Sequence, residues 1–167
     1  MNVMANSDSA APGGRTEQLD FGVLLGLAYQ QFVAELHEHL AEHGFTGLRP
    51  AFGYAFKALQ NEAMTTTELA TRLGITPQGA AKTVEEMVTA GYVARIPDPA
   101  DRRARRLVLT GRCQTLLAVA HEFHQGFEQN LAAGLGRDKL ATLRDFLGAI
   151  IARASSPDGL ARAIRQI

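Results

Sequence analysis

Apolar residues recur at helical spacing through a long segment near the start of the chain. Residues 17–43 are expected to form one helix that ends at Gly44, because glycine is a common helix stop. The apolar positions of this helix step by three or four residues: Leu25, Tyr29, Phe32, Leu36 and Leu40. A second apolar set widens the face, and contact with a partner subunit is one explanation for a surface of this width.

Two further helices are predicted in the last third of the chain. One covers residues 111–133 and is expected to break at Gly134 and Gly136. The other covers residues 137–154, and residues 159–167 can form a last short helical turn. The apolar face of the second helix consists of Leu140, Leu143, Leu147, Ile150 and Ile151.

Short helices with marked ends are predicted between the long ones. Residues 51–60 have helical apolar spacing, and residues 68–73 follow a capping box made by Thr65 and Glu68. Gly74 is expected to close this second short helix.

A third short helix is predicted over residues 77–90. Thr76 can cap its start, and Pro77 suits the first helical position because the N–H that proline lacks would be unpaired there. Gly91 is expected to end it in the left-handed conformation. Its inward face is expected to consist of Ala80, Val84, Met87 and Val88.

Two short strands follow, over residues 92–96 and 105–109, because apolar and polar positions alternate there. The segment between them is rich in proline and charge, as expected for a turn. The order helix, glycine turn, helix, strand, charged loop, strand is that of a winged helix-turn-helix. The expected fold is mainly α with a small β-hairpin wing and about six helices in all.

Charge is unevenly distributed, although the formal net charge is +0. Residues 95–112 hold six arginines and only two acids, Asp98 and Asp101, so this stretch carries about +4 and the remainder about −4. A polyanion would be attracted to the basic stretch and repelled elsewhere, which can orient its approach.

The pattern assigns DNA contacts to the start of the helix over 77–90. Gln78 can pair with adenine, and Lys82 can reach a base edge or a phosphate. Gly79 and Ala81 are small enough for a close approach, and Thr76 with the free amides of the helix start suits a phosphate.

The wing is expected to supply the remaining contacts. Arg102 and Arg103 at its tip are placed to enter a minor groove, where narrow A·T tracts concentrate negative potential. Asp101 is expected to hold an arginine guanidinium in place through a charge-assisted pair, because a carboxylate should not face phosphate.

These motifs resemble the DNA-binding half of the MarR family. The run Asp98-Pro99-Ala100-Asp101-Arg102-Arg103, followed by Leu107-Val108-Leu109-Thr110, is similar to the wing signature of that family. Asp101, Arg103 and Arg106 match its Asp-x-Arg-x-x-Arg pattern, which adds Arg106 to the expected DNA-binding residues. The resemblance covers about residues 48–110 in detail.

The resemblance implies a homodimer whose N- and C-terminal helices intertwine. It implies binding to a pseudo-palindromic promoter site, with half-sites roughly 34–36 Å apart. The implied function is a ligand-responsive transcription regulator, expected to be a repressor, and not an enzyme. Residues 1–15 are then a flexible tail, 16–47 a dimerisation helix, 48–110 the winged domain and 111–167 the C-terminal dimerisation helices.

A small-molecule effector, aromatic or another organic compound, is also implied. It would bind between the dimer layer and the winged domain and act through different affinities for two dimer geometries. Candidate pocket residues are Tyr29, Phe32, Phe52 and Phe56, although each of these can equally be core. Cys113 stands where many members carry glycine, and no cysteine lies near the start of the first helix, so oxidation sensing by that route is not expected.

Two alternatives stay open on the sequence. The His39/His43 and His121/His124 pairs are spaced to share a helix face and can contribute to a zinc or nickel site in a metal-responsive regulator, although surface histidines are the simpler reading. A winged-helix adaptor that binds protein rather than DNA is the other alternative.

Other classes lack support in the sequence. A hydrolase built on Cys113 and His121 would need an orienting acid and an oxyanion hole, and no phosphate-binding glycine loop occurs. No cofactor is expected. No apolar run reaches membrane-spanning length and no secretory signal is recognisable, so a cytoplasmic protein is expected.

Overall fold

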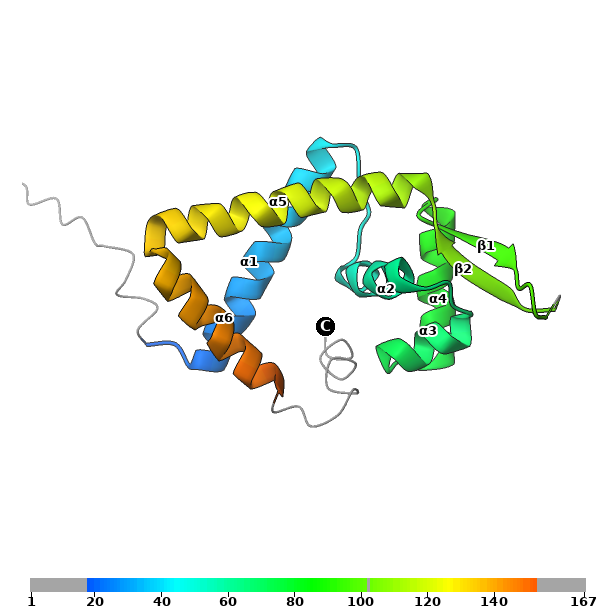
Figure 1. The fold of residues 1–167 in the computed structure, drawn as a ribbon, viewed down its shortest axis with the longest axis horizontal. Helices are drawn as coiled ribbons and strands as arrows, with labels where there is room; N and C mark the ends of the chain where they lie inside the picture. Colours follow the sequence, from blue (N-terminus) through cyan, green and yellow to red (C-terminus); the bar gives the residue numbers. More distant parts are fainter. Residues whose placement is uncertain (1–17, 102, 153–167) are drawn as a thin grey trace, which may run out of the picture.

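The computed structural model describes residues 18–101 and 103–152 (Figure 1). This described part contains six helices and one two-stranded antiparallel sheet, which confirms the expected winged helix-turn-helix architecture. The elements are α1 (Phe21–Glu42), α2 (Pro50–Asn61), α3 (Thr66–Leu73), α4 (Pro77–Thr89), β1 (Val93–Pro97), β2 (Arg105–Leu109), α5 (Gly111–Leu135) and α6 (Arg137–Ala152). Residues 1–17 and 159–167, and with them the predicted tail and last helical turn, lie outside the described residues.

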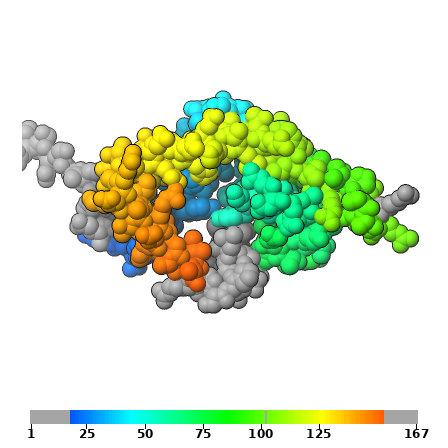
Figure 2. All heavy atoms as spheres, viewed as in Figure 1, coloured from blue at the N-terminus to red at the C-terminus, as the bar shows by residue number. Residues whose placement is uncertain are grey.

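The molecule has two parts that one long helix joins. α2, α3, α4 and the β1–β2 hairpin pack together, while α1 and α6 pack on α5 (Figure 1). α5 starts against β2 and runs across the molecule to α6, as its yellow-green band shows in Figure 2. The winged part and the helical layer therefore share α5.

The hydrophobic core lies mostly in the winged part. Phe56, Leu69, Val84 and Met87, from α2, α3 and α4, are almost completely buried. α5 contributes Cys113 to this core from its first turn. α1 and α6 contribute little to it, since Leu40 is the one buried residue of α1 and α6 has none among its described residues.

The helix ends form largely as the sequence predicts. Thr65 Oγ1 accepts a hydrogen bond from the backbone N–H of Glu68 at 3.2 Å, and the Glu68 carboxylate accepts one from the Thr65 N–H at 2.7 Å. The capping box is therefore confirmed. Gly74 and Gly91 have φ angles of 61° and 76°, so both short helices end where only glycine adopts the backbone easily.

The hairpin pairs Val93 with Leu109 at its base and Pro97 with Arg105 at its outer end. The first strand begins one residue later than predicted. A further contact comes from outside the hairpin, because the Leu107 N–H donates to the carbonyl oxygen of Met64 at 2.7 Å. The connection between α2 and α3 thus fixes the wing to the core.

α5 is longer than the sequence predicts. The expected break at Gly134 is wrong, since the helix continues through Leu135 and ends at Gly136, which has a φ of 91°. A glycine inside a helix costs only about 1 kcal/mol relative to alanine, and tertiary packing overrides that preference.

Large apolar side chains remain exposed on the helical layer. They are Leu19, Phe21, Val23, Leu27, Leu135, Leu143, Phe146, Ile150 and Ile151; in the winged part Ile96 is also exposed. The concentration of such residues on α1 and α6 leaves an apolar surface that one copy of the described chain does not cover. None of the described helices is long and apolar enough to cross a membrane.

Candidate nucleic-acid interface

Helix α4 turns its polar side chains outward and its apolar ones inward. Gln78, Ala81 and Lys82 are exposed, whereas Ala80 and Val84 are completely buried. The split follows from the helical period, since residues three and four apart lie on the same face. The outward residues lie within the first two turns, the part of a recognition helix that meets base edges.

The start of α4 is tightly built around Thr76. Its Oγ1 accepts a hydrogen bond from the Gly79 N–H at 3.1 Å, which confirms Thr76 as the cap. A Cβ added at Gly79 would lie 3.2 Å from the same oxygen, closer than an ordinary contact. Gly79 therefore keeps the cap undistorted as well as keeping the surface low.

Ion pairs connect α4 to its neighbours. Arg95 of β1 donates to Glu85 at 2.7 Å, and the Arg49 guanidinium, just before α2, lies 3.2 Å from Glu86. The first pair matters for an anionic partner, because it neutralises a carboxylate on the exposed side of α4. The nearby Lys82 has no carboxylate partner among the described residues.

The turn of the wing is organised by Asp98, which the sequence did not single out as a site residue. Its Oδ1 accepts hydrogen bonds from the Ala100 and Asp101 N–H groups, at 2.7 and 3.3 Å. Its Oδ2 accepts a hydrogen bond from Arg106 Nε at 2.6 Å. The Ala100 amide and the Arg106 guanidinium hold the pKa of the Asp98 carboxyl below its ordinary value.

Arg106 is partly exposed, and its guanidinium is bound by neighbours within the winged part. Besides its pair with Asp98, its Nη1 donates to the Ala63 carbonyl oxygen at 2.7 Å, in the connection between α2 and α3. The hydrogen bond that Arg106 donates to the Asp98 carboxylate raises the pKa of the Arg106 guanidinium. Arg106 was expected at the DNA surface, and the contacts that the structure shows for it link the wing to the helix-turn-helix.

Asp101 and Arg103 lie in the wing turn. Asp101 Oδ1 accepts the backbone N–H of Arg103 at 2.9 Å, and the guanidinium of Arg106 is bound by Asp98. Arg103 is exposed, and no carboxylate of the described residues pairs with its guanidinium. Arg102 lies outside the described residues.

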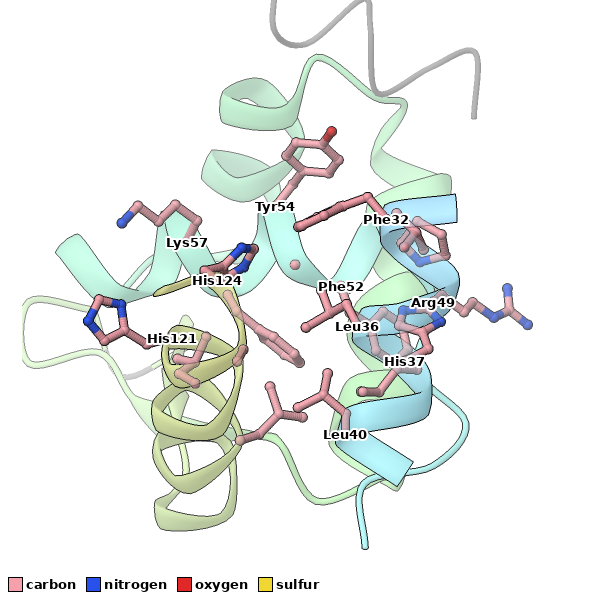
Figure 3. A pocket seen from close by; sticks show the side chains of 18 of the residues that line it. Phe32, Leu36, His37, Leu40, Arg49, Phe52, Tyr54, Lys57, His121 and His124 are labelled. Atoms are coloured by element: carbon pink, nitrogen blue, oxygen red, sulfur yellow. The ribbon is translucent and has the colours of Figure 1, made fainter. Parts of the chain in front are cut away.

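A second site lies between the two parts of the molecule. Tyr29 and Phe32 of α1 and Phe52 and Phe56 of α2 line one cavity of about 490 Å³, together with residues of α5 (Figure 3). The structure thus brings together all four aromatic residues that the sequence singles out. Burial, and then a hydrogen bond with Tyr54, raise the pKa of the Tyr29 hydroxyl to about 12, so it is neutral at physiological pH.

The histidine pairs do not converge on an ion site in residues 18–101 and 103–152, where no group of three or more His, Cys, Asp or Glu side chains is placed to hold one. The rings of His39 and His43 lie 4.6 Å apart, and His43 Nδ1 is 2.8 Å from the His39 carbonyl oxygen. His121 and His124 of α5 line the cavity instead.

Cys113 is completely buried in the first turn of α5. Burial raises the pKa of its thiol to about 12. A thiol with this pKa is protonated at neutral pH and is a poor nucleophile, so nothing about its surroundings favours a catalytic or redox-sensing role.

Comparison with known proteins supports the assignment of a DNA-binding winged helix-turn-helix. A sequence profile of the MarR family matches residues 53–104, from the first turn of α2 to the wing turn. The fold is similar to that of CouR, a transcriptional repressor solved with a 23-mer DNA duplex, with 27% identity over 85% of this chain and 99% of that chain and a TM-score of 0.64. It is similar to transcriptional regulator Tm0710 from Thermotoga maritima, with 26% identity over 81% and 94% of the chains and a TM-score of 0.52.

A mutant of MarR from E. coli, complexed with operator DNA, has the same fold, with 24% identity over 81% of this chain and 96% of that chain and a TM-score of 0.63. No curated protein sequence matches the chain.

The outward polar face of α4 and the basic hairpin beside it define a winged helix-turn-helix protein of the DNA-binding class. The profile match covers the helix-turn-helix and the first wing strand, and the structural matches cover most of the chain. The chain therefore has the winged helix-turn-helix fold of these regulators, and its residues 53–104 match the MarR family.

Proposed function

We propose that this MarR-family regulator represses transcription by binding a pseudo-palindromic promoter site as a homodimer, and that a small organic effector releases it. The observation that carries the proposal is the pair of unneutralised cations, Lys82 on α4 and Arg103 on the wing, on two adjacent DNA-reading elements. CouR and MarR, which have the same fold, are both solved with DNA.

In this proposal α4 and the wing contact different grooves of the DNA. Gln78 and Lys82, with the small residues Gly79 and Ala81 beside them, read the major groove, while Thr76 and the amides of the helix start contact a phosphate. Arg102 and Arg103 enter the minor groove.

Arg106 and Asp98 have a different part. Their ion pair and the Arg106 contact with Ala63 hold the wing at a fixed angle to α4, so Arg106 positions the arginine tip and does not itself touch DNA. Asp101 supports the same turn by accepting the Arg103 N–H.

The second copy of the chain is argued from the exposed apolar residues of α1 and α6. A monomer would leave Phe21, Phe146, Ile150 and Ile151 in water, each worth about 1.5–3 kcal/mol when buried. A symmetric pairing of the α1–α5–α6 layers covers these residues and holds two α4 helices at a fixed spacing.

Titration of a promoter fragment at several salt concentrations tests the proposal. Specific binding should weaken steeply as salt rises, because each phosphate contact releases counterions. Arg103→Ala should reduce affinity about tenfold and leave the melting temperature unchanged, whereas Arg137→Ala on α6 is the matched control and should have no effect on DNA affinity.

Two results would contradict the proposal. Binding without a salt slope, or no binding to DNA at all, would favour a protein-binding adaptor. Unchanged affinity of the Arg103→Ala variant would show that the wing does not touch DNA.

A further inference from the structure

An ion pair joins the outward face of α4 to the wing. Arg95 Nη2 of β1 donates a hydrogen bond to the Glu85 carboxylate at 2.7 Å, and the two side chains have exposed fractions of 37% and 64%. The pair spans the junction of α4 and the β1–β2 hairpin, which lie side by side in Figure 1. It therefore lies at the open surface between the two elements that are proposed to contact DNA.

The register of the hairpin turns Arg95 toward α4. Arg95 is opposite Leu107 in the ladder, and residues opposite each other project from the same face of a hairpin. Leu107 and Val93, which is two positions before Arg95, are buried on that face. β1 runs outward beyond the core, so the same face carries an exposed charge at Arg95, within reach of Glu85.

Glu85 lies on the same face of α4 as Gln78 but further from the start of the helix. It is seven positions after Gln78, which is about two turns and about 10 Å along the helix axis. A recognition helix presents its first turns to the base edges, and the major groove is about 8.5 Å deep. When Gln78 is at the base edges, the Glu85–Arg95 pair is therefore at about the level of the phosphates.

A sugar–phosphate strand separates the major groove, which α4 is proposed to enter, from the minor groove, which the wing tip is proposed to enter. That strand must pass between α4 and the hairpin, where the Arg95 side chain lies. In the described part of the chain the Arg95 guanidinium donates to Glu85 alone. A guanidinium has further N–H donors in the same plane, and their geometry suits a phosphate. Arg95 can thus bind the carboxylate and a phosphate at once.

We propose that Arg95 contacts a phosphate of this strand, and that Glu85 is a positioning residue that holds the Arg95 guanidinium toward it. This inference rests on the proposed function and adds a DNA contact that the sequence motifs do not assign. The contact would lie between α4 and the wing tip, so it would favour DNA only when both elements have the angle that the strand requires.

The pair has a purely structural alternative, in which it only fixes the wing to α4. The two explanations differ in salt dependence, because a phosphate contact releases counterions and a link within the protein does not. They also differ at Glu85. A carboxylate that merely faces DNA repels the phosphates, so the loss of its charge alone should tighten binding, whereas the loss of an acceptor that positions Arg95 should weaken it.

Fluorescence-anisotropy titrations of the full chain, with the promoter fragment and a scrambled fragment at several salt concentrations, test the proposal. Arg95→Ala should weaken binding to both fragments about equally, by about threefold to tenfold, and should reduce the salt slope by about 1. Arg144→Ala removes the same charge from an exposed pair with Glu128 in the helical layer. It is the matched control and should keep the wild-type slope. Light scattering checks that each variant keeps the wild-type mass.

Two variants of Glu85 separate its charge from its role as an acceptor. Glu85→Gln and Glu85→Ala both remove the charge, and only glutamine keeps an oxygen that can accept from Arg95. Glu85→Gln should therefore bind both fragments at least about threefold more tightly than Glu85→Ala. The difference should disappear when each variant is combined with Arg95→Ala, because no guanidinium is then left to position.

An unchanged salt slope for Arg95→Ala would overturn the proposal and leave the pair as a link within the protein. Equal affinities of the two Glu85 variants would overturn it as well, because Glu85 would then act through its charge alone. In either case salt-dependent binding of the wild-type chain to the promoter fragment would still support the proposed function. A wild-type chain that binds neither fragment would refute the proposed function and this inference together.

Discussion

Arg103 and Arg106 lie three positions apart, and the wing places them in opposite surroundings. Arg103 is exposed, whereas Arg106 is held by the buried carboxylate of Asp98 and by the Ala63 carbonyl oxygen. A sequence motif shows that arginines are present but does not show which way each one points. We therefore expect the two arginines to differ in what their replacement costs: DNA affinity alone for Arg103, and DNA affinity with thermal stability for Arg106.

Arg106→Ala should lower both DNA affinity and the melting temperature, because the buried Asp98 carboxylate would lose its partner and the wing its link to Ala63. Arg103→Ala should lower affinity alone. Thermal melting followed by fluorescence, beside a DNA titration, separates the two. An Arg106→Ala variant with full thermal stability would show that the ion pair does not hold the wing.

The same pair gives the wing a dependence on pH. The pKa of Asp98 is lowered in the folded chain, so its contribution to stability is present above the unfolded-state pKa and is lost as the pH falls through the folded-state pKa. Melting at acid pH should therefore reveal a loss that an Asp98→Asn variant, already lacking the charge, does not show.

Cys113 should react very slowly with iodoacetamide in the native protein at about pH 8, because its buried thiol has a pKa of about 12. Labelling should become fast in denaturant. Mass spectrometry of the labelled chain measures both rates. Rapid native labelling would mean that the first turn of α5 opens.

Among the elements, those whose ends carry their own local signals could be predicted best. Thr65 with Glu68, Thr76 with Pro77, and Gly74 and Gly91 mark helix ends through bonds between neighbours in sequence, and the structure has these ends. Features set by distant contacts could not be predicted this way. The bond between Leu107 and Met64, and the Asp98–Arg106–Ala63 links, join segments whose closeness only the fold creates.

Helix α4 carries a prediction of its own. Lys82→Ala should weaken binding to every DNA sequence equally and reduce the salt slope by about 1 if Lys82 contacts a phosphate. If it contacts a base, the variant should instead lose discrimination between sequences. Titrations with the promoter fragment and a scrambled fragment distinguish the two, and unchanged binding to both would remove Lys82 from the interface.

At the scale of the whole molecule, the exposed apolar surface of α1 and α6 is where we propose that a second subunit packs. The helical periodicity of residues 137–154 was visible in the sequence, but the part it packs against was not. In the structure α6 has no buried residue among those described, so nothing in one described copy of the chain buries its apolar face.

Phe146→Glu should dissociate the dimer, because it places a charge on the apolar surface beside Phe21, whose ring centroid is 5.4 Å from that of Phe146. Light scattering after size-exclusion chromatography measures the mass. Asp145→Lys, a change at the neighbouring exposed polar position, is a control that should remain dimeric. A wild-type chain that elutes as a monomer would end the case for a paired layer.

α5 spans 25 residues, so it is a stiff rod about 37 Å long. Cys113 and Leu116, in its first turns, are embedded in the winged part, and its other end meets α6. His121 and His124 lie between, where the rod borders the cavity. A tilt of α5 by about 10° around its middle would move its first turns by about 3 Å, and α4 would move with them. In the proposed dimer, a ligand that tilts α5 would therefore change the spacing of the two α4 helices, which would no longer fit both half-sites of the DNA.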